Sequence, residues 1–260
     1  MEGSGGGTEL VENAPEVIIQ DLNRIYKGSD EAVHAVKDIS LTLTPGSFTA
    51  LVGFSGCGKT TLLRMLAGLE EPSSGSISLF PENSYPAVIF QTPRLLPWMT
   101  IKKNMNIALR HRVIPRQNKR EIKKRVHAAL EMVGLNDRAD AYPHELSGGM
   151  AQRVGLARAL CQESGFMLMD EPFSSLDALT RENLQKELKS IWEKKKSTTL
   201  FITHDIAEAL VLASRILIMK EGSIIADLDR NDWILRNKPE AAIMSLMNNP
   251  LIPRMVYATS

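Results

Sequence analysis

The chain has 260 residues, 43% hydrophobic and 23% charged, which is typical of a globular protein with one large domain or a domain with a subdomain. The formal net charge of +1 argues against a nucleic-acid binder that works by neutralising phosphates, and two cysteines, Cys57 and Cys161, are too few for a disulfide framework or a zinc site. No apolar run approaches the roughly 18 residues of a membrane span, and we see no signal peptide. A reducing cytoplasm is therefore the expected compartment.

The first part of the chain reads as strands, turns and one helix. Residues 1–16 are Gly-rich and acidic, and we expect them to form a flexible tail. Short alternating or wholly apolar runs predict strands, one of them after the turn signal Pro45-Gly46. In chain order the predicted elements are strands at Val17–Asp21, Ile39–Leu43 and Phe48–Val52, a helix at Lys59–Ala67, and strands at Ser76–Phe80 and Ala87–Phe90.

The pattern becomes helical between residues 100 and 160. In the run Lys119–Leu135 the apolar residues recur on one helical face, and Gly134 is a stop signal. Another helix is predicted at Met150–Leu160, which is rich in Ala, Leu, Arg and Gln. The apolar face of the first run consists of Ile122, Val126, Ala129, Leu130 and Val133.

Strands return in the last third of the chain. The predicted elements are a strand at Phe166–Met169, a helix at Leu179–Lys195, a strand at Thr198–Thr203, and a hairpin of Ile216–Met219 with Ser223–Ala226. Strands that alternate with helices on both sides of a helical insert predict an α/β domain, residues 17–228, with a helical subdomain at about residues 92–160. Residues 229–260 are expected to form a helical C-terminal tail.

The stretch GFSGCGKTT, Gly53–Thr61, fits the G-x-x-x-x-G-K-S/T pattern between an apolar strand and a helix. Its glycines let backbone N–H groups surround phosphates, Lys59 brings a charge to the β- and γ-phosphates, and the Thr60 hydroxyl is a ligand for magnesium. This phosphate loop predicts a nucleotide-binding P-loop NTPase core, a mixed sheet flanked by helices with an antiparallel β region. The expected contacts are Gly53, Phe54, Ser55, Gly56, Cys57, Gly58, Lys59, Thr60 and Thr61.

Two carboxylates end the apolar run FMLMDE, Phe166–Glu171. A buried strand would deliver Asp170 to the edge of the sheet where α/β proteins bind ligands, and there it would hold magnesium. Glu171 faces differently and is placed to orient or deprotonate an attacking water. The alternative is a strand that merely ends in acidic residues facing solvent.

The stretch LSGGMAQR, Leu146–Arg153, which we call the signature segment, raises a separate question. A serine and two glycines ahead of a helix leave its first N–H groups bare, which is a ready site for an anion. The chain already has a phosphate site in the phosphate loop. The sequence therefore predicts two anion sites in one protein.

The phosphate loop, the signature segment and MLMDE, in that order, together resemble the ATP-binding cassette (ABC) ATPases. The resemblance covers about residues 17–226, and Met150 replaces the commonest Gln of the signature. It implies that two cassettes pack head to tail, so that each ATP lies between the phosphate loop of one subunit and the signature segment of the other. The signature residues implied to face the partner's ATP are Leu146, Ser147, Gly148, Gly149, Met150 and Gln152.

More positions match this family. Tyr26 sits where the family places an aromatic ring on adenine, and Gln91 matches the glutamine that senses magnesium and the γ-phosphate, alongside the magnesium ligands Thr60 and Asp170. His204, after an apolar strand, matches the switch histidine at the γ-phosphate, and Asp205 is a plausible N-cap for the next helix. The loop that crosses the dimer interface is matched by Ser174, Ser175, Leu176 and Asp177.

The resemblance also suggests what the ATPase drives. Membrane-spanning permease subunits would be separate chains, and the apolar segment Thr92–Thr100 would either receive a short permease helix or simply pack the helical subdomain. LLPW after Gln91 is similar to importers of nitrate, sulfonate, taurine or bicarbonate, which implies an extracytoplasmic solute-binding protein and a place at the cytoplasmic face of the inner membrane.

Three other readings stay open from the sequence. An ABC importer ATPase for another solute carries the same motifs. A non-transport ABC ATPase of DNA repair would carry coiled-coil arms between Thr61 and Leu146, where no sustained heptads lie, and translation-type relatives typically hold two cassettes in one chain. A plain P-loop kinase or GTPase would leave the signature segment and His204 unexplained.

Overall fold

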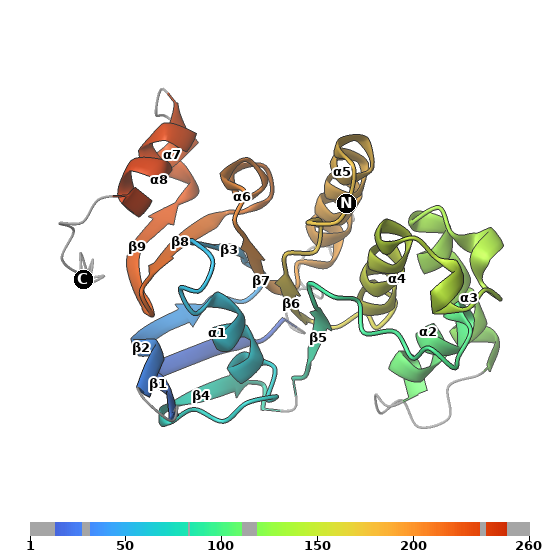
Figure 1. Cartoon of the computed structure of the whole chain (residues 1–260), viewed down its shortest axis with the longest axis horizontal. Coiled ribbons are helices and arrows are strands. Elements are labelled where there is room, and N and C mark those ends of the chain that lie inside the picture. The colour runs from blue at the N-terminus through green and yellow to red at the C-terminus, as the bar shows by residue number, and fades with distance from the viewer. Residues whose placement is uncertain (1–13, 28–31, 83, 111–118, 235–237, 249–260) are drawn as a thin grey trace, which may run out of the picture.

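The computed structural model describes residues 14–27, 32–82, 84–110, 119–234 and 238–248 (Figure 1). Two sheets lie at the centre, and a group of helices stands to one side of them. This arrangement confirms the predicted α/β class with a mixed sheet, flanking helices and an antiparallel region. None of the helices in these ranges has the length and hydropathy needed to cross a membrane.

The larger sheet has six strands in the order β5-β6-β7-β3-β8-β9. Its first five strands run parallel, and only β9 is antiparallel to its neighbour. The carboxyl ends of the parallel strands therefore meet at one edge of the sheet, where the loops that follow them come together. The strands are β3 (Phe48–Val52), β5 (Pro86–Ile89), β6 (Phe166–Asp170), β7 (Thr198–Thr203), β8 (Arg215–Lys220) and β9 (Ser223–Asp229).

The fully buried strands of this sheet are explained by cores on both of its faces. Along β3, Phe48, Ala50 and Val52 belong to one core, and Leu51 belongs to the other. β7 divides in the same way, with Phe201 on the first side and its neighbours on the second. Because successive side chains of a strand point to opposite faces, a strand covered on both faces is buried along its whole length and is mostly apolar, with small threonines as its polar residues.

The second sheet is antiparallel, with the order β2-β1-β4. Its strands are β1 (Glu16–Lys27), β2 (Ala32–Leu43) and β4 (Ser74–Phe80). β1 and β2 are longer than the predicted strands because their polar residues are accommodated at irregularities of register, where Asp21 and Asp38 adopt positive φ. Ala14 and Pro15, assigned to the tail, are buried, and the Pro15 carbonyl accepts a hydrogen bond from Thr198. Glu16, also assigned to the tail, begins β1, and residues 1–13 of the predicted tail lie outside the described residues.

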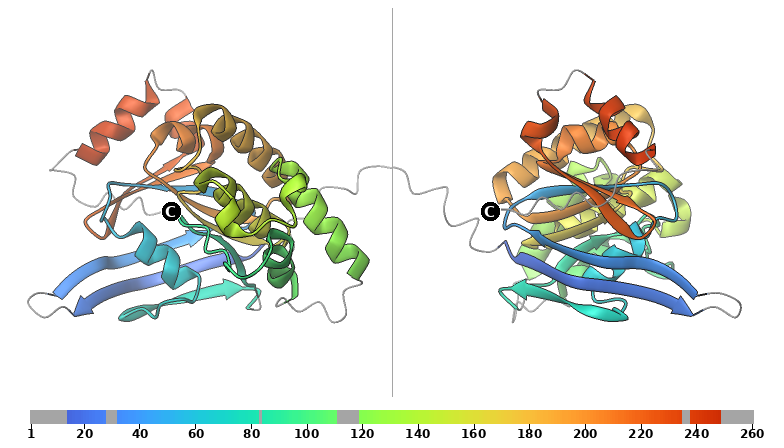
Figure 2. Two further views of the ribbon diagram at one scale, coloured as in Figure 1. Left: turned by 45° about the vertical axis from the view of Figure 1, so that its right-hand side comes forward. Right: turned by 90° about the vertical axis from the view of Figure 1, so that its left-hand side faces the viewer.

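Helices cover both faces of the larger sheet (Figure 2). α1 (Lys59–Leu66) packs in the core between the two sheets, and α2, α3 and α4 form the separate helical group. The predicted apolar face of α3 is confirmed, since four of its five residues are buried and Gly134 ends it at φ 64°. The other helices are α2 (Ile101–Arg110), α3 (Lys119–Met132), α4 (Gly148–Leu160), α5 (Ala178–Lys195), α6 (Ile206–Leu212), α7 (Arg230–Ile234) and α8 (Pro239–Asn248).

Candidate functional site

The phosphate loop joins the end of β3 to the start of α1. The Lys59 side chain turns back into the loop, and its Nζ donates to the carbonyls of Gly53 at 2.7 Å and Phe54 at 2.9 Å. Gly58 is the N-cap of α1 at φ 108°, and a Cβ there would lie 2.1 Å from the Ala35 carbonyl oxygen. The loop is therefore closed by its own lysine and needs glycine for reasons internal to this chain.

Asp170 lies at the end of β6 beside the first turn of α1. The Thr60 hydroxyl donates to Asp170 Oδ1 at 3.4 Å. Burial raises the pKa of Asp170, and the Thr60 hydrogen bond and the charge of Lys59 oppose that shift. The site thus brings two oxygen atoms that could bind a metal together, next to the loop lysine.

These two oxygens fit magnesium rather than a metal with an all-protein shell. No group of three or more His, Cys, Asp or Glu side chains arranged to hold a metal occurs in the described part of the chain. Magnesium commonly takes one or two protein ligands and completes its shell with phosphate oxygens and water. Thr60 and Asp170 match that requirement, whereas the Gln91 amide N–H donates to Glu171, so its ligand role stays a prediction.

Three neighbouring strand ends bring Gln91, Glu171 and His204 together. Glu171 follows β6 at φ 44°, and its N–H donates to the carbonyl of Ile202 on β7. Gln91 Nε2 donates to Glu171 Oε2 at 3.2 Å, and His204 Nδ1 lies 3.1 Å from the same oxygen. The strand order β5-β6-β7 explains this meeting, because each of the three residues follows one of these strands.

Tyr26 stands at the edge of the phosphate loop near the end of β1. Its hydroxyl lies 3.4 Å from Thr61 Oγ1, and the Arg24 guanidinium lies 4.8 Å from the centre of its ring. Arg24 also pairs with Glu70 at 2.8 Å, which fixes the guanidinium over the ring. Sequence reasoning missed Arg24, although its position two residues before Tyr26 places both on one face of the strand. The stacking of adenine on Tyr26 stays a prediction.

The signature segment starts α4, and one of its boundaries was predicted wrongly. α4 begins at Gly148 rather than Met150, with Ser147 as its N-cap and the Ser147 hydroxyl accepting from Met150 N at 3.3 Å. Both glycines are therefore inside the helix. Neither has positive φ, and a Cβ on Gly148 would meet nothing within 4 Å.

Gln152 does not belong to the exposed part of this segment. Its side chain is buried, and Nε2 donates to the carbonyls of Phe90 at 3.3 Å and Pro172 at 3.2 Å. It therefore tethers α4 to the segments beside Gln91 and Glu171, and we withdraw its assignment to a partner's ATP. Leu146 and Met150 are partly buried and pack against the core, which leaves Ser147 and the two glycines as the outward part.

The segment Ser174–Asp177 lies next to the start of α4. A Cβ on Gly149 would lie 3.4 Å from the Ser175 carbonyl oxygen. Ser174 is tied to Glu171 through its hydroxyl at 3.0 Å, and Asp177 caps α5 by accepting from Thr180 N. The segment thus links the catalytic candidate Glu171 to the exposed start of α4.

In the apolar segment Thr92–Thr100, some residues pack against the helical group and one is exposed, so each predicted role fits a different part of it. Leu95 packs against the core of the helical group, and Asn104 holds the Leu96 backbone through its side chain. Trp98, in contrast, is 68% exposed. Part of the segment therefore packs the helical group, and its tryptophan is available to another molecule.

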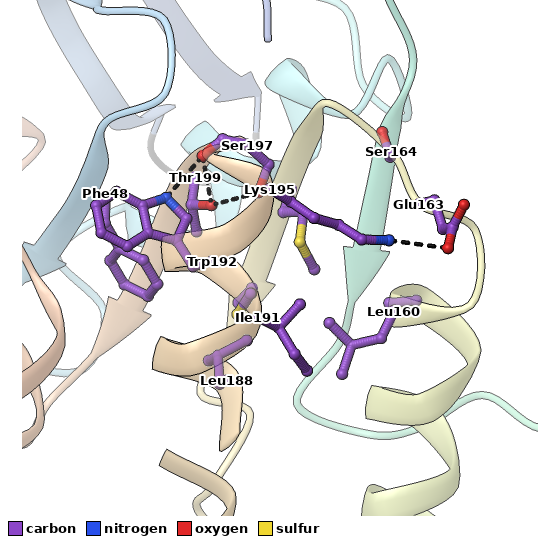
Figure 3. Close-up of a pocket in the computed structure, with 13 residues that line it drawn as sticks. Phe48, Leu160, Glu163, Ser164, Leu188, Ile191, Trp192, Lys195, Ser197 and Thr199 are labelled. Atoms are coloured by element: carbon purple, nitrogen blue, oxygen red, sulfur yellow. Dashed lines mark hydrogen bonds and ion pairs between the residues drawn. The ribbon is translucent and has the colours of Figure 1, made fainter. Parts of the chain in front are cut away.

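Cavities also lie elsewhere among the described residues. One, between α4, α5 and the larger sheet, measures about 10 Å³ and lies beside the ion pair of Lys195 and Glu163 (Figure 3). A space of this size holds at most about one water molecule. The other, about 270 Å³, lies between α2 and α3, with Ile122 and Val126 in its lining. The phosphate loop lines neither of these two cavities.

The family model described as ABC transporter matches residues 36–174. The chain is 46% identical over 210 residues to the aliphatic sulfonates import ATP-binding protein SsuB of Granulibacter bethesdensis, which covers 80% of this chain and 83% of that protein. It is 45% identical over 193 residues to the nitrate import ATP-binding protein NrtC of Synechococcus elongatus, covering 72% of this chain but only 29% of that longer protein. A solved dimeric post-hydrolysis state of the ATP-binding cassette MJ0796, bound to ADP and Pi, is similar at 28% identity, with a TM-score of 0.77 over 82% of this chain and 98% of that chain.

Proposed function

The chain belongs to the ABC transporter family, and on this premise we propose that it is the ATP-hydrolysing subunit of an importer, acting as one of a pair of ATPase subunits. That it binds and hydrolyses ATP follows from the family and from the relative that holds ADP and Pi. The pairing, the roles of single residues and the transported solute are the proposal.

The open space at Gly148 is the observation that carries the pairing. Glycine at the start of a helix weakens it by up to about 1 kcal/mol, and no contact among the described residues requires it there. An exposed helix start with bare N–H groups attracts an anion. In Figure 1, α4 stands with α2 and α3 on the other side of β5 and β6 from α1, so this start serves a phosphate loop other than its own. The dimeric relative supports the proposal that this other phosphate loop belongs to a second ATPase subunit.

ATP binding reorganises the phosphate loop. Lys59 Nζ exchanges the carbonyls of Gly53 and Phe54 for phosphate oxygens, and the loop N–H groups hold the β-phosphate. Tyr26 lies where adenine would stack on its ring. Magnesium, when bound by Thr60 and Asp170, supplies positive charge to the phosphates.

Hydrolysis then depends on the cluster around Glu171. Its carboxylate orients a water and takes its proton as the water attacks the γ-phosphate. Gln91 donates to this carboxylate and holds it from the β5 side. His204 contacts Glu171 through Nδ1, which leaves Nε2 to contact a γ-phosphate oxygen.

The names of the relatives support a direction of transport and a class of solute. The matched proteins are named as import ATP-binding proteins for aliphatic sulfonates and for nitrate, so we propose a small oxyanion as solute. Membrane-spanning permease subunits would hold the pair at the cytoplasmic face of the inner membrane, with Trp98 available to contact them. An extracytoplasmic binding protein would deliver the solute.

Concentration dependence of ATP hydrolysis tests the pairing. Because each site needs groups from two subunits, the rate per subunit should rise with protein concentration and reach a plateau as the pair forms. A rate per subunit that stays constant under dilution, in a sample shown by light scattering to be monomeric, contradicts the proposal.

Reconstitution tests the import function. The chain, with its permease subunits in proteoliposomes, should hydrolyse ATP faster when the binding protein is loaded with nitrate or an alkanesulfonate than when it is empty. Stimulation by a solute of another class would support the proposed import function but contradict the proposed class of solute. Stimulation by DNA or RNA, with no solute effect, would favour a non-transport ABC ATPase.

A further inference from the structure

The ring of His204 is held weakly by its surroundings. The side chain is 61% exposed, and its ion-pair partner is Glu171. Its position therefore depends on the backbone turn between β7 and α6. That turn is fixed by side chains, since Asp205 N donates to Thr203 Oγ1 at 3.0 Å and Asp205 Oδ1 caps α6 through Ala207 N at 2.9 Å.

A buried carboxylate underlies this turn. Glu208, in the first turn of α6, is 7% exposed and accepts the Thr203 hydroxyl at 2.6 Å. Gln185 of α5 donates to its other oxygen at 3.3 Å. Burial raises the pKa of Glu208, and the Thr203 hydroxyl and the Arg181 charge act in the opposite direction. A lone carboxylate in the apolar helix IAEALVL was the sequence signal for this group, and it was overlooked.

Arg181 connects this turn to the segment after Glu171. Its Nη2 donates to the Leu176 carbonyl at 3.1 Å, inside the segment Ser174–Asp177. Its Nη1 lies 3.8 Å from Asp205 Oδ2, and its Nε lies 3.8 Å from Glu208 Oε1. Arg181 Nε is buried with no hydrogen-bond partner among the described residues, so a small approach of α5 to α6 would close the bond to Glu208.

From this geometry we propose that Arg181 and Glu208 are positioning residues for ATP hydrolysis. Arg181 transmits the position of the Ser174–Asp177 segment to Glu208 and Asp205, and these two set the turn that carries His204. A partner that engages the exposed Ser174 and Ser175 therefore also places the His204 ring. The inference rests on the role in hydrolysis proposed above for His204.

The test separates positioning from stability by comparing kcat with KM. Glu208→Gln and Arg181→Gln should each lower kcat about tenfold and leave KM for ATP within about twofold, because neither residue touches the phosphate loop. The double variant should lose no more than the worse single variant, since both act through one turn. Arg181 is the safer position, because its side chain is 34% exposed and its loss leaves no large cavity.

Two control variants come from α5 itself. Lys186→Gln removes an exposed ion pair with Glu182 and should change neither constant. Leu184→Val removes one buried methylene, should lower the Tm by about 2–4 °C and should leave kcat unchanged below the melting range. A normal kcat in both Glu208→Gln and Arg181→Gln overturns the inference, as does an equal loss in Leu184→Val.

His204→Ala distinguishes this inference from the proposal beneath it. Full turnover in His204→Ala shows that the histidine has no role in hydrolysis, and the inference falls with it. Lost turnover in His204→Ala, together with unchanged kcat in the Arg181 and Glu208 variants, keeps the proposed function and overturns only the positioning role.

Discussion

The glycines of the phosphate loop and those that start α4 differ in what surrounds them. A Cβ on Gly53 would lie 2.3 Å from the Met219 carbonyl oxygen, and one on Gly58 would lie 2.1 Å from that of Ala35. A Cβ on Gly148 would meet nothing, and one on Gly149 would make only ordinary contact with Ser175. The first pair is required by the packing of this chain, and the second pair is not.

The polar groups of the phosphate loop and of the start of α4 show the same contrast in how far the chain itself holds them. Lys59, Thr60 and Asp170 all have partners within the chain, and two of them are buried. Ser147 is exposed, and within the described part of the chain its side chain makes only the local bond that caps its own helix. One half of the site is thus prepared by folding, whereas the other half, on our proposal, is completed by a second molecule. Substitutions in the two halves should therefore fail in different ways.

The largest effect is expected from Glu171→Gln in the prepared half. Removing the proposed general base should lower turnover by about 100-fold or more while ATP still binds, because the phosphate loop is unchanged. The variant should accumulate as a nucleotide-held dimer, measured by size-exclusion chromatography with ATP. Normal hydrolysis would mean that another residue is the base.

Glu221→Gln is the matched control for this substitution. Glu221 is an exposed glutamate that shares with Glu171 a positive φ, at 48°, so it reports any general effect of placing Gln in that backbone conformation. Its turnover should equal that of the unmodified chain.

Ser147→Arg tests the open half. A long charged side chain at the helix start should block the partner's phosphates and lower turnover about 100-fold, with ATP affinity of the monomer within about twofold. Ser147→Ala is the control, because it costs about 1 kcal/mol of cap stability without adding bulk. Undiminished hydrolysis in Ser147→Arg would mean that the start of α4 does not bind a partner's phosphates.

Gly58→Ala and Gly148→Ala compare the two halves directly by stability. Gly58→Ala introduces strain at φ 108° and a clash with backbone, so it should lower the free energy of unfolding by about 2–4 kcal/mol. Gly148→Ala should leave it unchanged or raise it by up to about 1 kcal/mol. Urea denaturation measures both. A clear loss of stability in Gly148→Ala would show that the chain itself needs this glycine.

The sequence was informative where one local segment decides the structure. The phosphate loop, the apolar strand before Asp170 and the N-cap Asp205 are all read from neighbouring residues, and the structure places them as expected. Strand order is less local, yet the meeting of Gln91, Glu171 and His204 follows once each is known to end a parallel strand.

Features that need distant partners were not predicted. From the sequence Gln152 looks like an exposed helix residue, but its side chain donates to the carbonyls of Phe90 and Pro172, which are distant in the sequence. The Arg181–Glu208 group unites side chains from α5, β7 and α6, and no periodicity in one segment reports such a meeting. The full length of β1 was missed because its irregular register lets polar residues continue a strand.

The smallest effect concerns the far end of α4, where Cys161 is the C-cap. Whereas Ser147 at the first end is exposed, Cys161 is 4% exposed and donates to the Arg158 carbonyl. Burial raises the pKa of the Cys161 thiol to about 12, from an ordinary value of 9.0. At a pH between these two values the folded chain keeps the thiol proton, whereas the unfolded chain loses it. The free energy of unfolding therefore falls as the pH rises from 9.0 toward 12.

Cys161→Ala removes this dependence, so the stability advantage of the unmodified chain over the variant should shrink as the pH rises. Between about pH 8 and pH 10 the difference in free energy of unfolding should fall by roughly 1 kcal/mol. Between about pH 7 and pH 8 it should stay constant, because the thiol is protonated in both states there. A difference that is also constant up to about pH 10 would mean that Cys161 ionises as readily in the folded chain, and that this end of α4 is as open as its start.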